Sequence, residues 1–325
     1  MKLWKDNRHA RYTYKYLRGA FQHAFSSMAN DKAGGKLLII GMVISMFLWG
    51  LSWPSGKVLS GYCSVVNFTV YRYVIVVITT AMLLPIMGIS FRLRKQGIPV
   101  FIASGVLLAV YSYFFFMGIK KGTAGAGGVL VTTMNPIMAY MLGIALSRRL
   151  PSRNEGIGLL LGIAAGITLL KLWDSTAALL DSGNLYFLMA ALTWAVMSKF
   201  TARGAQYGTS LSFSLWQYMV TLLCFLPFTD VAEMQATLQT ANLRFWGNLI
   251  FSSAIVTSGA TTIYFYTTTR LGAEKASSFI FLVPLAAAIS SWLLLGEKLQ
   301  VHTMAGGILG IAAVYIMNKK RKTQP

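Results

Sequence analysis

The pentapeptide Leu161-Gly162-Ile163-Ala164-Ala165 occurs a second time as Leu309-Gly310-Ile311-Ala312-Ala313, an offset of 148 positions. Five further pairs keep nearly the same register, at offsets of 148 or 145: Pro136 and Pro284, Gly158 and Gly306, Trp49 and Trp194, Phe68 and Phe213, and Tyr73 and Tyr218. One short identity arises easily by chance in an apolar chain, but several anchors in one register do not. The sequence therefore predicts two similar halves.

Long apolar runs fill most of the chain around these anchors. The 325 residues are 55% hydrophobic and 12% charged, about half of the ~25% charged share of soluble domains, and the mean hydropathy is +0.59. One bilayer crossing needs ~20 mostly apolar residues. Ten runs are of this kind: 37–57, 66–88, 98–119, 123–147, 155–172, 184–201, 209–229, 247–269, 273–295 and 301–317. The sequence predicts an all-α polytopic membrane protein with ten transmembrane helices.

The repeat divides these ten spans equally. Residues 37–172 form the predicted first five-helix repeat and residues 184–317 the second, with basic tails at 1–36 and 318–325. Because five is an odd number, the second copy enters the membrane from the opposite face. Two inverted five-helix repeats are typical of secondary transporters, whose substrate site lies near the midplane between the repeats.

The net charge of +20 by itself would fit a nucleic-acid binder. With both termini placed inside, however, the inner segments hold 22 of the 29 Lys and Arg residues and the outer segments hold six. Cytoplasmic segments of membrane proteins are enriched in Lys and Arg. The charge pattern therefore predicts a multi-pass protein of the bacterial inner membrane with both termini cytoplasmic and no nucleic-acid partner.

The N-terminal tail, residues 1–36, mixes basic and aromatic side chains. It fits an amphipathic segment on anionic lipid. It also fits a disordered tail, or a chain start that has been assigned too far upstream of Met28. A cleavable signal peptide is not expected, because the first apolar run begins only near Leu37.

Several short motifs follow one another in the order of a known family. Phe47-Leu48-Trp49-Gly50 opens the first span, Phe68 to Arg72 opens the second, and Leu295-Gly296-Glu297-Lys298 follows the ninth. Over residues 37–318 the chain resembles an EamA-type permease of the drug/metabolite transporter superfamily. The resemblance implies a central cavity lined by spans one, three, four, six, eight and nine. The chain departs from it at Arg148-Arg149, which replace the Gly-Glu pair in the first half.

Arg72 is the basic residue farthest from a span end. A basic side chain at the bilayer centre costs about 2.5–3.5 kcal/mol on insertion scales, so it normally faces protein or water. We expect Arg72 either to contact a substrate anion or carboxylate, to act as a gate, or to pair with backbone carbonyls near the outer surface. Lys57 and Lys199 lie near span ends, where snorkelling toward water is the ordinary expectation.

Aromatic and polar side chains inside the spans complete the candidate substrate site. Such groups need partners in hydrocarbon, and a wet cavity supplies them; the alternatives are an interfacial aromatic belt or interhelical hydrogen bonds. The stripe Thr257, Thr261, Tyr264 and Thr268 follows one face of span eight. With Arg72, the predicted substrate-binding residues are Trp49, Trp53, Tyr111, Tyr113, Asn135, Trp194, Thr261 and Tyr264.

Pro136 and Pro284 occupy matching positions in spans four and nine. Each proline removes a backbone donor and frees the carbonyl four residues earlier. Their equivalence in the repeat favours helix bends with a role in transport, whereas a packing kink is the simpler alternative.

The sequence lacks the signatures of several other activities. None of the nine carboxylates and three histidines lies at a predicted midplane, which argues against carboxylate-based proton coupling. Cys63 and Cys224 form no redox or metal motif, and neither HExxH nor a P-loop is present. We therefore expect no enzyme activity, no metal, no cofactor and no direct ATP drive.

These observations predict a secondary transporter of small organic metabolites, such as amino acids or related solutes, working by alternating access. An antiporter of anionic substrates such as nucleotide sugars is the alternative, and a non-transporting membrane scaffold is a third possibility. The expected partners are a small-molecule substrate and the bilayer, with the chain acting as a monomer or weak homo-oligomer.

Overall fold

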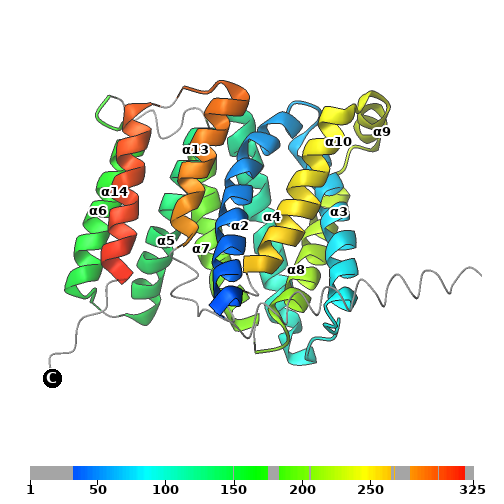
Figure 1. Ribbon diagram of the computed structural model, residues 1–325, viewed down its shortest axis with the longest axis horizontal. Coiled ribbons are helices and arrows are strands. Elements are labelled where there is room, and N and C mark those ends of the chain that lie inside the picture. Colours follow the sequence, from blue (N-terminus) through cyan, green and yellow to red (C-terminus); the bar gives the residue numbers. More distant parts are fainter. Residues whose placement is uncertain are drawn as a thin grey trace, which may run out of the picture.

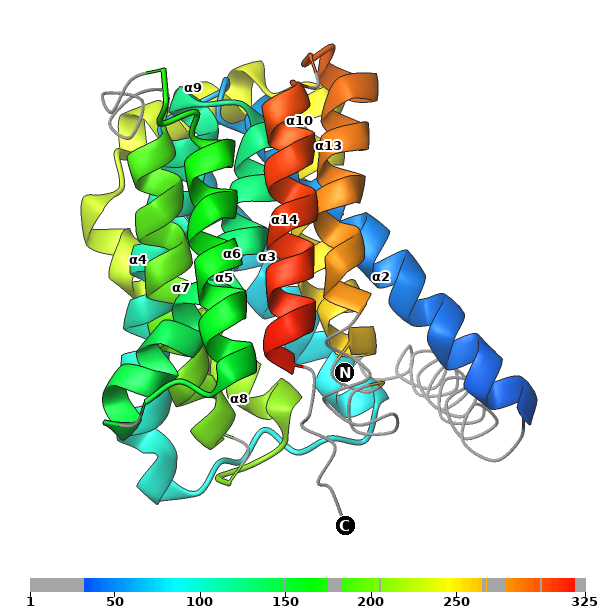
Figure 2. The same ribbon diagram turned by 90° about the vertical axis from the view of Figure 1, so that its left-hand side faces the viewer.

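The computed structural model describes residues 32–148, 150–174, 183–204, 206–264, 267, 279–298 and 300–318. Within these ranges every regular element is a helix and no β-strand occurs. Figure 1 shows the long helices standing side by side, and Figure 2 shows α2 slanting away from the others at its N-terminal end. The expected all-α class is confirmed. The tails at 1–31 and 319–325 lie outside the described residues.

The helices of the first half are α2 (Lys32–Leu59), α3 (Val65–Ile86), α4 (Ile98–Lys121), α5 (Ala124–Ser147) and α6 (Arg153–Leu169). Those of the second half are α7 (Asn184–Gly204), α8 (Ser210–Phe225), α9 (Val231–Thr240), α10 (Leu243–Ile250), the π-helix η4 (Phe251–Ala260), α13 (Leu282–Leu295) and α14 (Val301–Asn318). Three 3₁₀ turns lie at η1 (Lys95–Gly97), η3 (Leu226–Phe228) and η5 (Phe279–Phe281).

Among the described residues, six helices are long and apolar enough to cross a bilayer. Their ranges are Gly35–Leu59, Val65–Ile86, Lys95–Lys121, Ala124–Leu146, Asn184–Gly204 and Ser210–Phe228. The helices at Leu282–Leu295 and Val301–Met317 are apolar but shorter. The chain is thus built as a multi-pass membrane protein.

The structure differs from the sequence prediction around the connector at 230–246. It lies between the expected spans 209–229 and 247–269, where the sequence predicted no span, and it contains α9, whose N-cap Asp230 accepts a side-chain hydrogen bond from the amide of Glu233. The helix is short and largely polar, so no apolar run marks it. The expected span 247–269 also begins earlier, at Leu243, and winds as a π-helix in its middle section. Residues 265–266 and 268–278 lie outside the described residues, including Thr268.

The helix that contains the first predicted span extends beyond it at the N-terminal end. It begins at Lys32, whereas the apolar run begins near Leu37. A helix needs only its backbone hydrogen bonds to continue, so it can extend beyond the apolar run that signals a membrane span.

Glycine allows α6 and α14 to pack closely at one edge of the molecule (Figure 1). A Cβ atom on Gly158 would lie 2.8 Å from the carbonyl oxygen of Ala313 in α14, too close for any larger residue. Elsewhere α2 packs along α13, α4 along α7 and α8, and α3 along α8 and η4. Together these contacts place α2, α3, α4, α7, α8 and η4 around Arg72, where the candidate site lies.

Candidate functional site

Arg72 connects α3 to the π-helix η4. Its Nη2 donates a hydrogen bond to Oγ1 of Thr257 at 2.6 Å, and this is the one hydrogen bond the guanidinium makes to the described residues. The Nε atom is buried without a partner among the described residues, although the side chain as a whole is partly exposed. A guanidinium carries five donors, so the described residues use only part of its hydrogen-bonding capacity.

The faces of two aromatic rings complete the surroundings of Arg72. Its Cζ atom lies 5.1 Å from the ring centroid of Phe116 and 5.9 Å from that of Tyr73. Cation–π contacts of this kind stabilise a cation without neutralising it. Within the described part of the chain no Asp or Glu forms an ion pair with Arg72.

The π-helical winding of η4 positions Thr257 for this contact. The Thr257 hydroxyl donates to the carbonyl oxygen of Ser252, five residues earlier, at 2.9 Å. That bond orients the hydroxyl so that a lone pair remains for Arg72. Wide π-helical turns are rare and occur frequently at functional sites.

A cluster of aromatic side chains extends from this point across α2, α4 and α7. Tyr111 lies 4.9 Å from Trp194 and 5.4 Å from Phe115, measured between ring centroids. Phe115 in turn lies 4.5 Å from Trp53 and 4.9 Å from Phe116, the residue beneath Arg72. The structure therefore brings four predicted residues into one connected group: Trp53, Arg72, Tyr111 and Trp194.

The other predicted residues lie outside this group. Trp49 and Tyr264 form a separate pair with centroids 5.2 Å apart. Tyr113 is 39% exposed and its ring contacts Phe114 rather than the cluster. Thr261 is the half-buried residue that follows η4. Asn135 is half-buried in α5, and its Oδ1 is buried with no hydrogen-bond partner among the described residues.

The two prolines occupy different local settings. Pro136 lies inside α5, whereas Pro284 lies in the first turn of α13, directly after the 3₁₀ turn η5. Pro is tolerated in a first turn because its missing donor would have had no intrahelical acceptor there.

Sequence reasoning missed some of the contacts around Arg72. Thr257 was recognised only as part of a polar stripe, and Tyr73 only as a repeat anchor. Nothing distinguished Phe115 and Phe116 from their neighbours, because an aromatic run carries no sign of which ring faces a cation. Lys57 was expected to snorkel, but its ammonium group binds backbone carbonyls of α4 instead.

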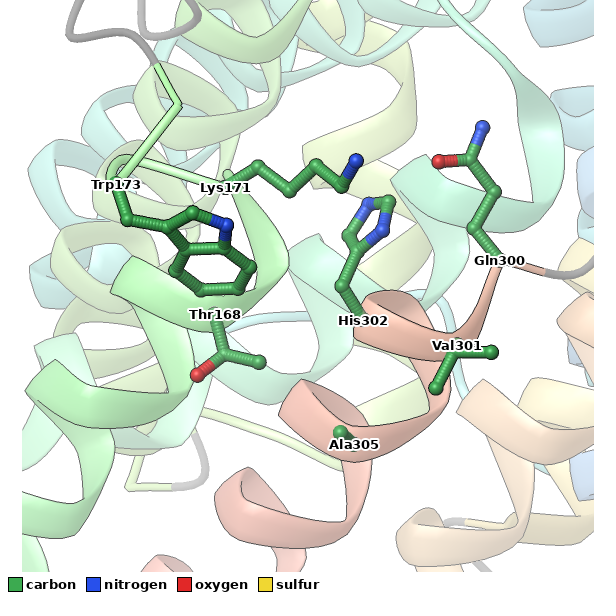
Figure 3. A pocket seen from close by; sticks show the side chains of 7 residues that line it. All are labelled: Thr168, Lys171, Trp173, Gln300, Val301, His302 and Ala305. Carbon is green, nitrogen blue, oxygen red and sulfur yellow. The ribbon is translucent and has the colours of Figure 1, made fainter.

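Two cavities lie away from this group. One of about 490 Å³ opens between the ends of α6 and α14, where Lys171 reaches toward His302 beside Trp173 (Figure 3). A second of about 290 Å³ lies between α2, α10 and α13, next to Ser55 and Asn248. Neither is lined by Arg72. The described residues contain no group of three or more His, Cys, Asp or Glu that would hold a metal ion.

Comparison with known proteins identifies the family. The profile of the EamA-like transporter family matches residues 36–171 and again residues 181–319. The chain belongs to the EamA-like transporter family. The expected family is thereby confirmed, and membership makes the chain a multi-pass membrane transporter, a class without enzymatic function, with a small-molecule substrate.

Individual EamA-like relatives cover most of the chain at low identity. The uncharacterized transporter YoaV of Bacillus subtilis is 21% identical over 86% of this chain and 96% of its own length. The uncharacterized transporter YdfC of the same organism is 26% identical over 88% of this chain and 93% of its own. A protein of known crystal structure aligns with a TM-score of 0.56 at 18% identity, over 87% of this chain and 97% of its own. That likeness supports the fold alone.

Proposed function

We propose that this EamA-like protein is a secondary transporter of small organic metabolites, amino acids or related solutes, working by alternating access. The observation that carries the proposal is the guanidinium of Arg72, which lies among aromatic rings. Among the described residues it has one hydroxyl partner, its buried Nε is unpartnered and no carboxylate forms an ion pair with it. A buried charge is costly unless it is paired. The carboxylate of a substrate would complete the pairing.

The chemistry of arginine narrows the ligand. Its planar fork binds carboxylates in a bidentate manner that a lysine does not reproduce. In this proposal Trp53, Tyr111 and Trp194 contact the less polar part of the solute. Other parts of the substrate path are then lined by Trp49, Tyr113, Asn135, Thr261 and Tyr264. Pro136 allows α5 to bend, and Pro284, in the first turn of α13, allows a bend where α13 follows η5.

The proposed architecture is ten transmembrane helices in two inverted five-helix repeats, residues 37–172 and 184–317. Its support includes the separate match of each half to the family profile. Ser64 caps α3 through its side chain, and Thr209, 145 positions later, caps α8 in the same way. Tyr71 donates to a carbonyl of α9, which follows α8, at 2.7 Å. Trp216, again 145 positions later, donates to a carbonyl that follows α3 at 2.8 Å.

We further propose that the protein resides in the bacterial inner membrane with both termini cytoplasmic, as a monomer or weak homo-oligomer. The distribution of Lys and Arg supports this orientation, because 22 of them fall on the proposed inner side and six on the outer. The basic tails at 1–36 and 318–325 then lie on the cytoplasmic side.

An antiporter of anionic substrates, such as nucleotide sugars, is the second candidate. Arg72 favours it as well, because a phosphate would satisfy the guanidinium as a carboxylate would. The two candidates differ in solute size and charge, which a transport panel separates directly.

The test is counterflow in proteoliposomes that hold the purified full chain. Vesicles loaded with a mixed metabolite pool are offered labelled amino acids, nucleobases and nucleotide sugars without an imposed gradient. We expect one class to accumulate above the level of empty vesicles. If no solute accumulates although the protein is folded, the transport proposal is wrong.

The role of Arg72 is tested in the same assay. Arg72→Gln should lower uptake of the accumulated solute at least tenfold, while Arg203→Gln, at the exposed end of α7, should leave it near the parent rate. Parent-like uptake by folded Arg72→Gln would show that the guanidinium does not bind the substrate.

A further inference from the structure

The ammonium group of Lys57 binds the C-terminal end of α4. Its Nζ donates to the carbonyl oxygens of Ile119 at 2.8 Å, Lys120 at 3.2 Å and Gly122 at 2.6 Å. The last carbonyls of a helix have no intrahelical donor and form the negative end of its dipole. Lys57, near the end of α2, thus satisfies the terminus of a neighbouring helix.

The carboxylate of Glu297 binds the N-terminal end of α5, which begins just after α4. Its Oε1 accepts from the amide of Ala124 at 2.9 Å and its Oε2 from the amide of Gly125 at 2.7 Å. The N-cap residue Thr123 makes no side-chain cap bond of its own. The first amides of α5 are therefore capped by a residue from the other half of the chain, where the helix dipole favours a negative charge.

Local geometry holds Glu297 in this place. Gly296 adopts a left-handed conformation at φ 67°, and its amide donates to the carbonyl of Trp292, which ends α13 and turns the chain back toward α5. A Cβ atom on Gly125 would lie 3.1 Å from Oε2 of Glu297. The carboxylate thus rests directly on a residue without a side chain.

The turn between α4 and α5 is consequently held from two sides. Lys57 of α2 donates hydrogen bonds to the end of α4, and Glu297, which follows α13, accepts hydrogen bonds from the start of α5. The two helices that carry these contacts, α2 and α13, pack along each other. At this end Leu59, Ile119 and Ala124 are fully buried. The helix ends pack tightly at this turn, and separating them requires that the turn leave both charged groups.

The opposite half carries different chemistry at the matching position. Arg148, 148 positions before Gly296, also has a left-handed φ, 47°. The next residue, Arg149, stands where the second half has Glu297; it lies outside the described residues. An arginine side chain has donors but no acceptor, so it cannot cap the amides of a helix. Arg149 therefore offers no carboxylate at the position that Glu297 occupies in the second half.

We propose that Lys57 and Glu297 form a latch that holds this end of the transporter closed and releases it in each cycle. The inference rests on the alternating-access function proposed above. Each charge binds a helix terminus rather than the other charge, so the latch is two separate caps on one turn.

A buried serine next to the latch provides the probe. Ser291 is fully buried, its Oγ has no hydrogen-bond partner among the described residues, and its Cβ would lie 3.2 Å from a Cβ on Gly125. Ser291→Cys in a Cys63→Ala, Cys224→Ala background is labelled with a polar maleimide in nanodiscs, where both faces are accessible. Adding Glu297→Gln should speed labelling at least tenfold. Asp174→Asn, a carboxylate paired with Lys171, should leave the rate unchanged; equal rates for both variants would overturn the latch.

A charge exchange separates two caps from a direct ion pair. In Lys57→Glu with Glu297→Lys, a carboxylate faces helix carbonyls and an ammonium group faces helix amides. If Lys57 and Glu297 act as two separate caps, the cysteine at position 291 should be labelled at least as fast in this double variant as in Glu297→Gln. If it is instead labelled as slowly as the parent, the two side chains stabilise each other and the cap mechanism is wrong.

The unmodified chain offers a measurement that does not depend on how a variant folds. The amides of Ala124 and Gly125 are protected by Glu297 rather than by the helix. Their hydrogen exchange should accelerate when a transported solute is added, and protection that is unchanged during turnover would contradict the latch. If no solute is transported while Glu297→Gln still speeds labelling, the proposed function fails and the closure by Glu297 stands.

Discussion

The rings of Tyr73 and Tyr218 meet with centroids 6.1 Å apart and an interplanar angle of 47°, although 145 positions separate them. The two residues are counterparts in the sequence repeat. Equivalent residues of two related units contact each other only where they lie close to the axis that relates the units. The contact therefore supports the proposed two-fold arrangement, in which the axis would pass between α3 and α8.

The hydroxyl of Tyr73 gives a first prediction, on stability. It is hydrogen-bonded to Oγ of Ser112 at 2.8 Å, and both residues are buried. Tyr73→Phe leaves the serine without this partner and should cost about 0.5–1.5 kcal/mol of unfolding free energy. Thermal unfolding in detergent measures the loss. Tyr113→Phe, at an exposed ring, is the control. An equal loss of unfolding free energy in this control would show that the buried Tyr73–Ser112 hydrogen bond does not account for the effect.

Thr257 gives a prediction on transport. Thr257→Val keeps the shape of the side chain but removes the hydroxyl that accepts from Arg72. A hydrogen bond to a charged group is worth about 1.5–3 kcal/mol, so the guanidinium should lose its orientation and the KM of counterflow should rise roughly tenfold or more. Thr257→Ser restores the acceptor and should restore the KM. Parent-like uptake by the valine variant would show that this contact does not position Arg72.

Gly127 gives a prediction on packing. A Cβ atom there would lie 2.2 Å from Cζ of Phe187, which is fully buried. Gly127→Ala should therefore destabilise the protein by about 1–3 kcal/mol through overpacking. Gly247→Ala in α10 meets nothing within 4 Å and should stabilise its helix by about 0.5–1 kcal/mol. Thermal unfolding of both variants checks the opposite signs.

Cys63 gives a prediction on pH. Burial, and then the negative charge of Glu233, raise the pKa of its thiol to about 11. In a Cys224→Ala variant, the rate of maleimide labelling should therefore rise about tenfold per pH unit from pH 7 to 9.5, because the thiolate is the nucleophile. A rate that levels off near pH 9 would contradict the raised pKa.

The same pKa has a consequence for stability. The folded state holds the proton of Cys63 more tightly than an unfolded chain, whose thiol has a pKa of about 8.5. This contribution is fully present below pH ~8.5 and is lost as the pH rises toward about 11. The unfolding temperature should fall across that interval, and the fall should be smaller in Cys63→Ala.

Part of the candidate site was accessible from the sequence. Arg72 stood out because a charge inside an apolar run is costly, and Trp53, Tyr111 and Trp194 because polar or indole groups inside spans need partners. Tyr113 shared those properties, yet its ring is exposed and away from the cluster. Two residues, about 200° of helical rotation, separate Tyr111 on the inner face of α4 from Tyr113 on the outer face, and composition does not resolve that difference.

The sequence alone determined the class of protein, its apolar helices and its membership in a family, because bilayer thickness and the cost of buried charge act on every local stretch of chain. Tertiary structure decided the partners: Thr257 for Arg72, 185 positions away, and the helix ends for Lys57 and Glu297. These contacts join distant segments through directional hydrogen bonds. Such bonds depend on how the helices pack and rotate against one another, which no local pattern records.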